Sequence, residues 1–145
     1  MKKELVAELN KYLANVGVAY IKTHNLHWNV VGLSFKQTHE YLESLYDEYA
    51  DILDDVAELL KKFDEAPLAS LKKYLEVADL KELEESAEIG EKQAIKIALD
   101  DVLHLRDQAY KARALADETP SAIGLLEGNI AFFDKAQWFL KAMLK

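Results

Sequence analysis

Cysteine is absent from this chain, and proline and glycine are scarce, with two and five residues among 145. The absence of cysteine excludes a disulfide framework and a thiolate metal site, and it suits a reducing cytoplasm. Few prolines and glycines mean few interruptions of regular structure, which favours long helices. With 50% hydrophobic residues, residues 1–145 are long enough to form a single domain with a real core.

Long apolar runs and basic clusters are missing as well. No apolar run approaches the roughly 18 residues that a membrane-spanning helix needs, and the start Met1–Leu5 lacks the hydrophobic region of a signal peptide. The formal net charge is −8, and only Lys2 and Lys3 cluster near the N-terminus. Since contacts with phosphates supply most non-specific affinity for nucleic acid, this charge argues against DNA binding. We expect a cytoplasmic protein without membrane contact.

Apolar residues recur at the helical period in four long segments. We expect helices over these segments, which are residues 3–31, 34–63, 86–116 and 121–144. Gly32 is the expected C-cap of the first helix, and Ser34 is the expected N-cap of the second. Gly17 lies inside the first helix, where glycine costs about 1 kcal/mol against alanine, and we interpret it as a sign of close packing.

The connection between the second and third expected helices is long. It contains Pro67, a short helical piece over residues 70–75 and a charged, ambiguous stretch over residues 76–85. Two antiparallel neighbours would need no such insert, so we interpret the connection as a crossover. We therefore predict an all-α fold, a four-helix bundle of the ferritin type with a short helix in the long crossover between helices two and three.

Histidine and carboxylate side chains recur at helical spacing in the second expected helix. His39 and Glu43 are four residues apart, as are Asp54 and Glu58, so each pair lies on one face. At about 100° per residue, the four residues fall within an arc of about 100°, centred about 140° from the apolar stripe of the same helix. Imidazole and carboxylate without thiolate are a ligand set for Fe, Mn or Zn. His27 differs, because it lies on the apolar stripe of the preceding helix.

Helix length decides how these pairs can hold a metal. Glu43 and Asp54 lie about 16 Å apart along the helix axis, whereas bonds from a metal to nitrogen or oxygen are about 2.0–2.2 Å. Both pairs of one helix therefore cannot hold the same ion. Either there are two half-sites, or an antiparallel second copy brings its later pair to the earlier pair of this copy. A two-fold axis produces the second arrangement, so we favour a metal site shared between subunits.

The order and spacing of these residues resemble the signature of the Dps-like mini-ferritins. The residues that carry the resemblance are His27-Trp28-Asn29-Val30-x-Gly32-x-x-Phe35-x-x-x-His39-Glu40-x-x-Glu43-x-x-Tyr46, followed by Asp54-x-x-Ala57-Glu58. The resemblance continues to Trp138 and covers nearly the whole chain. So long a spaced pattern is specific, and it implies a family function as well as a fold.

The resemblance implies a ferroxidase centre at a two-fold dimer interface. His27, His39 and Glu43 would come from one subunit, and Asp54 and Glu58 would come from its partner. Each interface centre would hold a pair of iron ions, and the protein would oxidise Fe²⁺ with hydrogen peroxide or, less well, with dioxygen. A hollow dodecameric shell would store the ferric mineral, which implies a role in iron homeostasis and in protection against oxidative stress.

Two other functions stay open. One alternative is a DNA-compacting stress protein with incidental metal binding, because many family members carry a lysine-rich N-terminal extension that binds DNA. Here the first expected helix begins almost at residue 3, so we do not expect DNA binding. The other alternative is a purely structural bundle, since acidic residues opposite an apolar stripe are usually solvated and a lone histidine on such a stripe usually belongs to the core.

Further histidines and both tryptophans have structural interpretations. His104 follows Asp101 in an acid-x-x-His motif, of which a di-iron bundle would need two copies. His104 lies about 140° from its apolar stripe, so we interpret it as an exposed surface histidine. His24 lies about 60° off its stripe and would at most support a ligand. We interpret Trp28 as a core or interface aromatic and Trp138 as a packing residue.

Acidic residues flank the start of the last expected helix. In the family, acids of this region line a three-fold pore for ferrous ion, but Gly124 stands where a family acid would lie. Compensation of the helix dipole is a sufficient interpretation of Asp117 and Glu118. Glu127 lies in the same region. A further departure is Leu59, where the family generally has arginine, so the support of the preceding glutamate differs.

Overall fold

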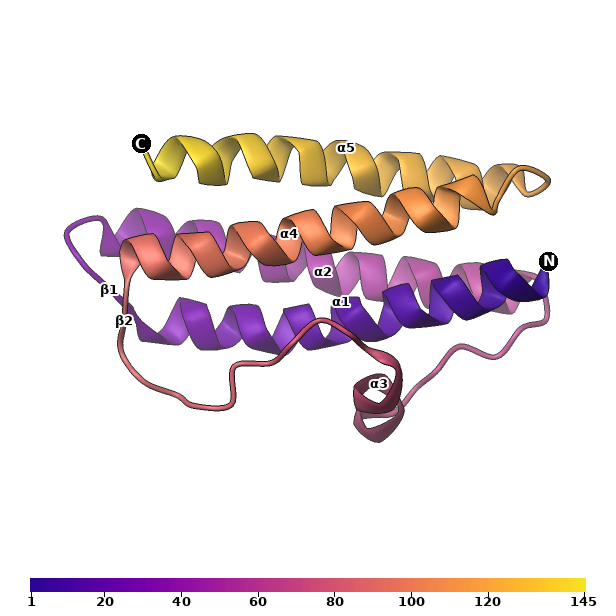
Figure 1. Cartoon of the computed structure of the whole chain (residues 1–145), viewed down its shortest axis with the longest axis horizontal. Helices are drawn as coiled ribbons and strands as arrows, with labels where there is room; N and C mark the ends of the chain where they lie inside the picture. Colours follow the sequence, from indigo (N-terminus) through magenta and orange to yellow (C-terminus); the bar gives the residue numbers. More distant parts are fainter.

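The computed structural model describes residues 1–145 as five helices and one small sheet. The elements follow in the order α1 (Lys3–Asn29), β1 (Val30–Val31), α2 (Phe35–Lys62), α3 (Leu71–Val77), β2 (Ile89–Gly90), α4 (Glu91–Ala114) and α5 (Pro120–Met143). Figure 1 shows the four long helices side by side, with α3 outside them on the connection between α2 and α4. The predicted all-α bundle with a short helix in a long crossover is confirmed.

The core lies between the four long helices. It contains a cluster of 32 buried hydrophobic residues. Each long helix contributes at least one large side chain that is fully buried, such as Tyr12, Tyr49, Leu105 and Phe133. The Tyr12 hydroxyl accepts a hydrogen bond of 3.0 Å from Asn129 Nδ2, so its burial leaves the phenol oxygen paired. Since burying a large apolar side chain contributes about 1.5–3 kcal/mol, the apolar stripes decide which helix faces meet.

The short helix α3 packs on the first helix at Gly17. A Cβ on this glycine would lie 2.7 Å from Cδ2 of Tyr74, which is closer than side chains tolerate. The glycine therefore lets the tyrosine ring lie directly on the α1 backbone. This contact confirms that the interior glycine marks close packing, and it anchors α3 although none of the α3 residues is fully buried.

The junction between α1 and α2 differs from the sequence-based expectation. The first helix ends at Asn29 and not at Val31, because Val30 and Val31 pair in parallel with the strand that precedes α4. The predicted glycine C-cap is therefore wrong, and Val30 occupies that position. Gly32 instead has a φ of +148°, and the carboxylate of Glu91 fills the space where a Cβ would be.

The carboxylate of Glu91 also links the start of α4 to the start of α2. Ser34 stands at the N-cap as expected, but its side chain makes no capping hydrogen bond. Its backbone N–H instead donates to both carboxylate oxygens of Glu91 at 3.0 Å. The third long helix, α4, begins at Glu91 rather than at residue 86 because the residues before it are extended. The junction thus ties the end of the crossover at α4 to the start of α2.

Asn15 fixes the crossover to the bundle. Its Oδ1 accepts the backbone N–H groups of Asp79 at 2.9 Å and Leu80 at 3.0 Å. Its Nδ2 donates to Asp79 Oδ1 at 2.9 Å, and a second donor to the same oxygen is Nε2 of His104 at 2.8 Å. His104 therefore lies at the surface, as expected, with its side chain 39% exposed, but it also anchors the crossover, which the sequence did not predict. Although partial burial raises the pKa of Asp79, hydrogen bonds from His104, Asn15 and Lys11 hold that pKa well below its usual value.

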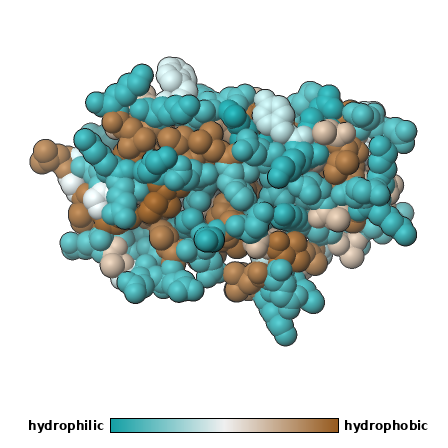
Figure 2. All heavy atoms as spheres, in the orientation of Figure 1, coloured by the Kyte–Doolittle hydropathy of each residue, from teal (hydrophilic) through white to brown (hydrophobic).

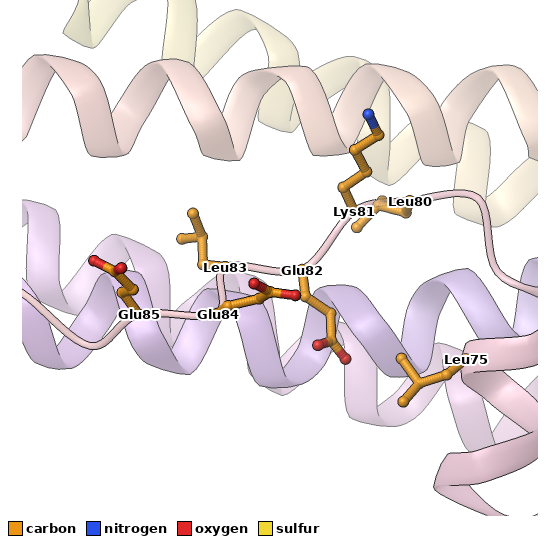
Figure 3. Close-up of a pocket in the computed structure, with 7 residues that line it drawn as sticks. All are labelled: Leu75, Leu80, Lys81, Glu82, Leu83, Glu84 and Glu85. Carbon is orange, nitrogen blue, oxygen red and sulfur yellow. The ribbon is translucent and has the colours of Figure 1, made fainter.

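Beyond this anchor the crossover is extended and acidic. Figure 3 shows Lys81 and Glu82 pointing to opposite sides of the segment, with Leu75 of α3 close to the segment. Glu82, Glu84 and Glu85 line a shallow pocket between the crossover and α3. Of the stretch that was ambiguous in sequence, residues 76–77 belong to α3, and residues 78–85 are neither helix nor strand, with mostly solvated side chains.

Hydrophobic side chains reach the surface along α1 and α3. Figure 2 shows a largely hydrophilic face on which hydrophobic groups gather beside α3. The exposed fractions are 58% for Ile21, 68% for Trp28, 69% for Leu71 and 54% for Leu75. None of the helices combines the length and apolar character that crossing a bilayer would require.

Candidate metal centre

His27 and His39 face each other across the α1–α2 junction. Their rings are stacked, with centroids 3.6 Å apart and planes 14° apart. Nδ1 of each ring lies 2.7 Å from the backbone carbonyl oxygen of the other residue. Because a carbonyl only accepts, each Nδ1 carries the proton, and in the neutral imidazole Nε2 keeps its lone pair. Reciprocal hydrogen bonds thus select the tautomer that binds a metal through Nε2.

Glu43 lies beside this pair on the next turn of α2. Its Oε1 is 3.8 Å from Nε2 of His27, which is too long for a hydrogen bond. His27 is only 5% exposed, whereas the side chain of Glu43 is 52% exposed. Two ligands of one ion, each about 2.1 Å from it, lie roughly 3–4 Å apart. The imidazole and the carboxylate are therefore spaced as two ligands of a common ion would be.

Asp54 and Glu58 lie further along α2 and are exposed. The structure brings His27, His39 and Glu43 together and leaves these two carboxylates apart from them. Within one chain, no group of three or more histidine and carboxylate side chains is arranged to hold a metal ion. The candidate metal-binding side chains of a single chain therefore form two separate groups. One contains the two histidines with Glu43, and the other contains the two carboxylates Asp54 and Glu58.

Tyr46 supports Glu43, a role that sequence reasoning missed, and His24 packs on Tyr46, in keeping with the expectation that it would at most support a ligand. The Tyr46 hydroxyl donates to Glu43 Oε1 at 3.3 Å, and its ring meets His27 edge-on at 5.1 Å. The ring of His24 stacks on the ring of Tyr46, with centroids 3.7 Å apart and planes 21° apart. Desolvation and the charge of Glu43 raise the pKa of Tyr46, so the phenol remains a donor. Spacings of three residues, Glu43 to Tyr46 and His24 to His27, were the available signal.

The acid-x-x-His motif of α4 does not form a metal site. Asp101 is buried and binds Nζ of Lys22 at 2.9 Å, so the ammonium group of this lysine occupies the place beside the carboxylate. Burial, partly offset by Lys22, raises the pKa of Asp101 to about 6. His104 is used elsewhere, on Asp79 of the crossover. The bundle interior therefore offers no second candidate for a centre within one chain.

Both tryptophans and the acids near α5 lie at the surface of the single chain. Trp28 is 68% exposed and lies 5.3 Å from His24, so it is not a core residue, and its interpretation as an interface aromatic stays a prediction. Trp138 is 66% exposed, and its ring contacts that of Phe139 with centroids 5.0 Å apart. Arg113 binds Glu127 at 2.9 Å and Asp117 at 3.6 Å. Ion pairing with this arginine, which sequence reasoning did not foresee, involves both acids.

Comparison with known proteins adds an independent finding. Residues 6–145 match the family of ferritin-like domains. The chain is 36% identical over 151 aligned residues to general stress protein 20U of Bacillus subtilis, with 99% of each chain covered. It superposes on a Dps protein from Bacillus brevis with a TM-score of 0.90, 33% identity and full coverage of both chains.

A further structural neighbour comes from Vibrio cholerae O1. It has a TM-score of 0.91 and 30% identity, and 99% of this chain and 90% of that chain are covered. That structure is described as a Dps protein and a member of a broad superfamily of ferritin-like diiron-carboxylate proteins. Both the fold and the donor chemistry of the candidate centre are compatible with that description.

Proposed function

The chain belongs to the Dps family of ferritin-like proteins, and on that premise we propose that it is a ferroxidase and iron-storage protein. It oxidises Fe²⁺ with hydrogen peroxide or, less well, with dioxygen, and it stores ferric mineral in a hollow dodecameric shell. The observation that carries this proposal is the stacked pair His27 and His39, whose reciprocal hydrogen bonds leave a free lone pair on both Nε2 atoms, with that of His27 next to Glu43. These hydrogen bonds orient both rings and fix the tautomer that binds a metal through Nε2, as the partners of metal-ligating histidines do.

Iron is the substrate of this site, and the donor set suits it. Imidazole nitrogen and carboxylate oxygen bind Fe²⁺, while carboxylates also stabilise the ferric product. A formal net charge of −8 favours accumulation of cations at the protein. The absence of cysteine is consistent with work in the reducing cytoplasm, where Fe²⁺ persists.

The complete centre is shared between subunits in this proposal. His27, His39 and Glu43 of one subunit meet Asp54 and Glu58 of the partner across a two-fold axis. Support comes from the partial donor set of the single chain and from the axial separation of about 16 Å within α2. An isologous interface supplies the missing carboxylates twice, so each dimer has two equivalent centres.

The apolar surface beside the site favours such a partner. Ile21 and Trp28 of α1 and Leu71 and Leu75 of α3 are more than half exposed. Ile21 lines one surface pocket with Trp28 and another with Leu71 and Leu75, and Trp28 lies 5.3 Å from His24. Exposed apolar groups of this size mark surfaces that another protein covers. A second copy of the chain would cover them and deliver its carboxylates at the same time.

Electron counting explains why a pair of irons matters. Hydrogen peroxide accepts two electrons, and two Fe²⁺ ions supply one each: 2 Fe²⁺ + H₂O₂ + 2 H⁺ → 2 Fe³⁺ + 2 H₂O. Neighbouring irons held by shared carboxylates deliver both electrons at one place, so no hydroxyl radical leaves the site. Removal of both Fe²⁺ and peroxide would by itself protect the cell against oxidative stress.

DNA compaction is the second candidate, because several relatives are named for DNA protection during starvation. The acidic net charge opposes it. A gel-shift assay at about physiological salt separates the two functions: we expect no retarded DNA. Retarded DNA at a protein concentration where Fe²⁺ oxidation is saturated would show that DNA compaction is a separate function of this protein.

Anaerobic titration calorimetry with Fe²⁺ tests the main proposal. We expect saturable binding by wild-type protein, followed by rapid oxidation when hydrogen peroxide is added. Analytical ultracentrifugation of the same sample should show a closed assembly of the expected mass. Absence of saturable Fe²⁺ binding in an intact assembly would end the ferroxidase interpretation and leave a structural bundle.

A further inference from the structure

Glu43 is exposed, yet its carboxylate stands in a defined place beside His27. We propose that His24 and Tyr46 form a clamp that positions the Glu43 carboxylate for the incoming metal ion. This inference rests on the proposed function and deepens it, since it assigns two positioning residues to the same centre. Neither residue would bind the metal; both would act through Glu43.

Tyr46 provides the contact with the carboxylate. Its hydroxyl donates to Oε1 of Glu43 at 3.3 Å, and the same oxygen lies 3.8 Å from Nε2 of His27. One phenol therefore holds the one oxygen that faces the imidazole. Hydrogen bonds to ligating carboxylates orient them and reduce the number of rotamers from which the metal must select.

His24 holds the tyrosine ring in place. Its ring lies parallel to that of Tyr46 at 3.7 Å, and its Nδ1 donates to the carbonyl oxygen of Tyr20 at 2.7 Å. This hydrogen bond fixes the orientation of the imidazole on α1, so the imidazole presents a fixed ring face on which the tyrosine ring stacks. Tyr46 is thereby confined between His24 and the edge of His27, 5.1 Å away.

A structural role alone does not account for this arrangement. Tyr46 and His24 are half-buried rather than fully buried, so aliphatic side chains would fill the same space. An aliphatic residue would lack the hydroxyl that reaches Oε1 of Glu43. The Tyr46 hydroxyl is bonded to the carboxylate that stands next to His27, and the His24 ring stacks on the tyrosine ring that carries this hydroxyl.

Cobalt binding tests the clamp without reference to iron oxidation. Co²⁺ is titrated into the assembled protein, and its visible ligand-field bands report both affinity and coordination. Tyr46→Phe keeps the ring and removes the hydroxyl, so we expect about tenfold weaker binding with an unchanged thermal midpoint, because lost support of a ligand typically costs 10–100-fold in affinity. Tyr110→Phe is the matched control: that tyrosine is 50% exposed on α4 and should bind Co²⁺ like wild type.

The same substitution is then made in a Glu43→Ala background. If Tyr46 acts through the carboxylate, Tyr46→Phe should change Co²⁺ affinity there by less than about twofold. An equal loss in both backgrounds would show that Tyr46 acts on the fold and would overturn the clamp. Wild-type affinity in the single variant Tyr46→Phe would overturn it as well.

His24 is tested by a conservative pair of substitutions. His24→Ala removes the stacking ring and should weaken Co²⁺ binding about tenfold. His24→Phe keeps an aromatic ring at this position, and its Co²⁺ affinity should lie within about twofold of wild type. Equal affinity of both variants and wild type would refute the role of His24. If wild type binds Co²⁺ but does not oxidise Fe²⁺, the proposed function fails and the clamp stands; if wild type binds no Co²⁺, the clamp fails too.

Discussion

Shells assembled from two differently damaged subunits test whether the centre is shared. One subunit carries His27→Ala and His39→Ala, and the other carries Asp54→Ala and Glu58→Ala. In a mixed dimer, one interface centre takes histidines from the second subunit and carboxylates from the first, all of them intact. The other centre of that dimer loses both halves. Each parent shell, by contrast, has damage in every centre.

The expected recovery follows from counting interfaces. In a one-to-one mixture about half of the dimers pair unlike subunits, and one of the two centres in each is complete. Co-assembled shells should therefore regain about a quarter of wild-type peroxide consumption with Fe²⁺. Co-expression followed by native mass spectrometry verifies that the shells are mixed. Parent shells mixed after assembly are the control and should stay inactive.

The alternative outcome is equally clear. Verified mixed shells that show no recovery above either parent would mean that the ligands are not shared across a two-fold axis. Because His27 is 5% exposed, its replacement can disturb folding. The test is therefore repeated with His39→Ala and Glu43→Ala, which leave that buried ring in place. Failure of both pairs would refute the shared centre, and an intrachain centre would have to be found.

Three further changes have distinct outcomes. Asp54→Ala with Glu58→Ala should abolish rapid Fe²⁺ oxidation but leave assembly mass and thermal midpoint unchanged, since both side chains are exposed; unchanged peroxide consumption would contradict the assignment. Asn15→Ala should lower the free energy of unfolding by about 1–3 kcal/mol, because two amides of the crossover lose their acceptor; urea titration and hydrogen exchange of the crossover measure this, and full amide protection would count against it. Lys22→Met should destabilise the protein by about 3–5 kcal/mol at pH 7.5, because it leaves Asp101 buried without its cation. Burial already raises the pKa of Asp101 to about 6, and loss of Lys22 raises it further. The carboxyl then takes up a proton as the pH falls, so the deficit in urea stability should be smaller at pH 5 than at pH 7.5; an equal deficit at both pH values would contradict this account.

Much of the fold followed from local patterns. Apolar residues at the helical period predicted four long helices, and the helical arc placed His39, Glu43, Asp54 and Glu58 away from the core stripe. The structure agrees: Glu43, Asp54 and Glu58 are exposed and His39 is half-buried. These predictions needed only the geometry of a single helix, which is independent of its neighbours.

The errors concern contacts between distant parts of the chain. Gly32 was expected to cap a helix, but it makes room for Glu91, whose carboxylate binds Ser34, 57 residues away in sequence. His104 was expected to be an exposed surface histidine, and its bond to Asp79, 25 residues away, was not foreseen. Neither partner carries a local signal, because any exposed glutamate or aspartate has the same appearance in sequence.

The sequence by itself determined the number of helices, the apolar face of each and which histidine and carboxylate residues are predicted to bind a metal. Only the tertiary structure decided that the rings of His27 and His39 stack and donate to each other's carbonyl, which frees both Nε2 atoms. It also placed Tyr46 behind Glu43. The physical reason is that helical periodicity is a local property, whereas the direction of a ring or hydroxyl toward its partner depends on how core packing sets α1 against α2.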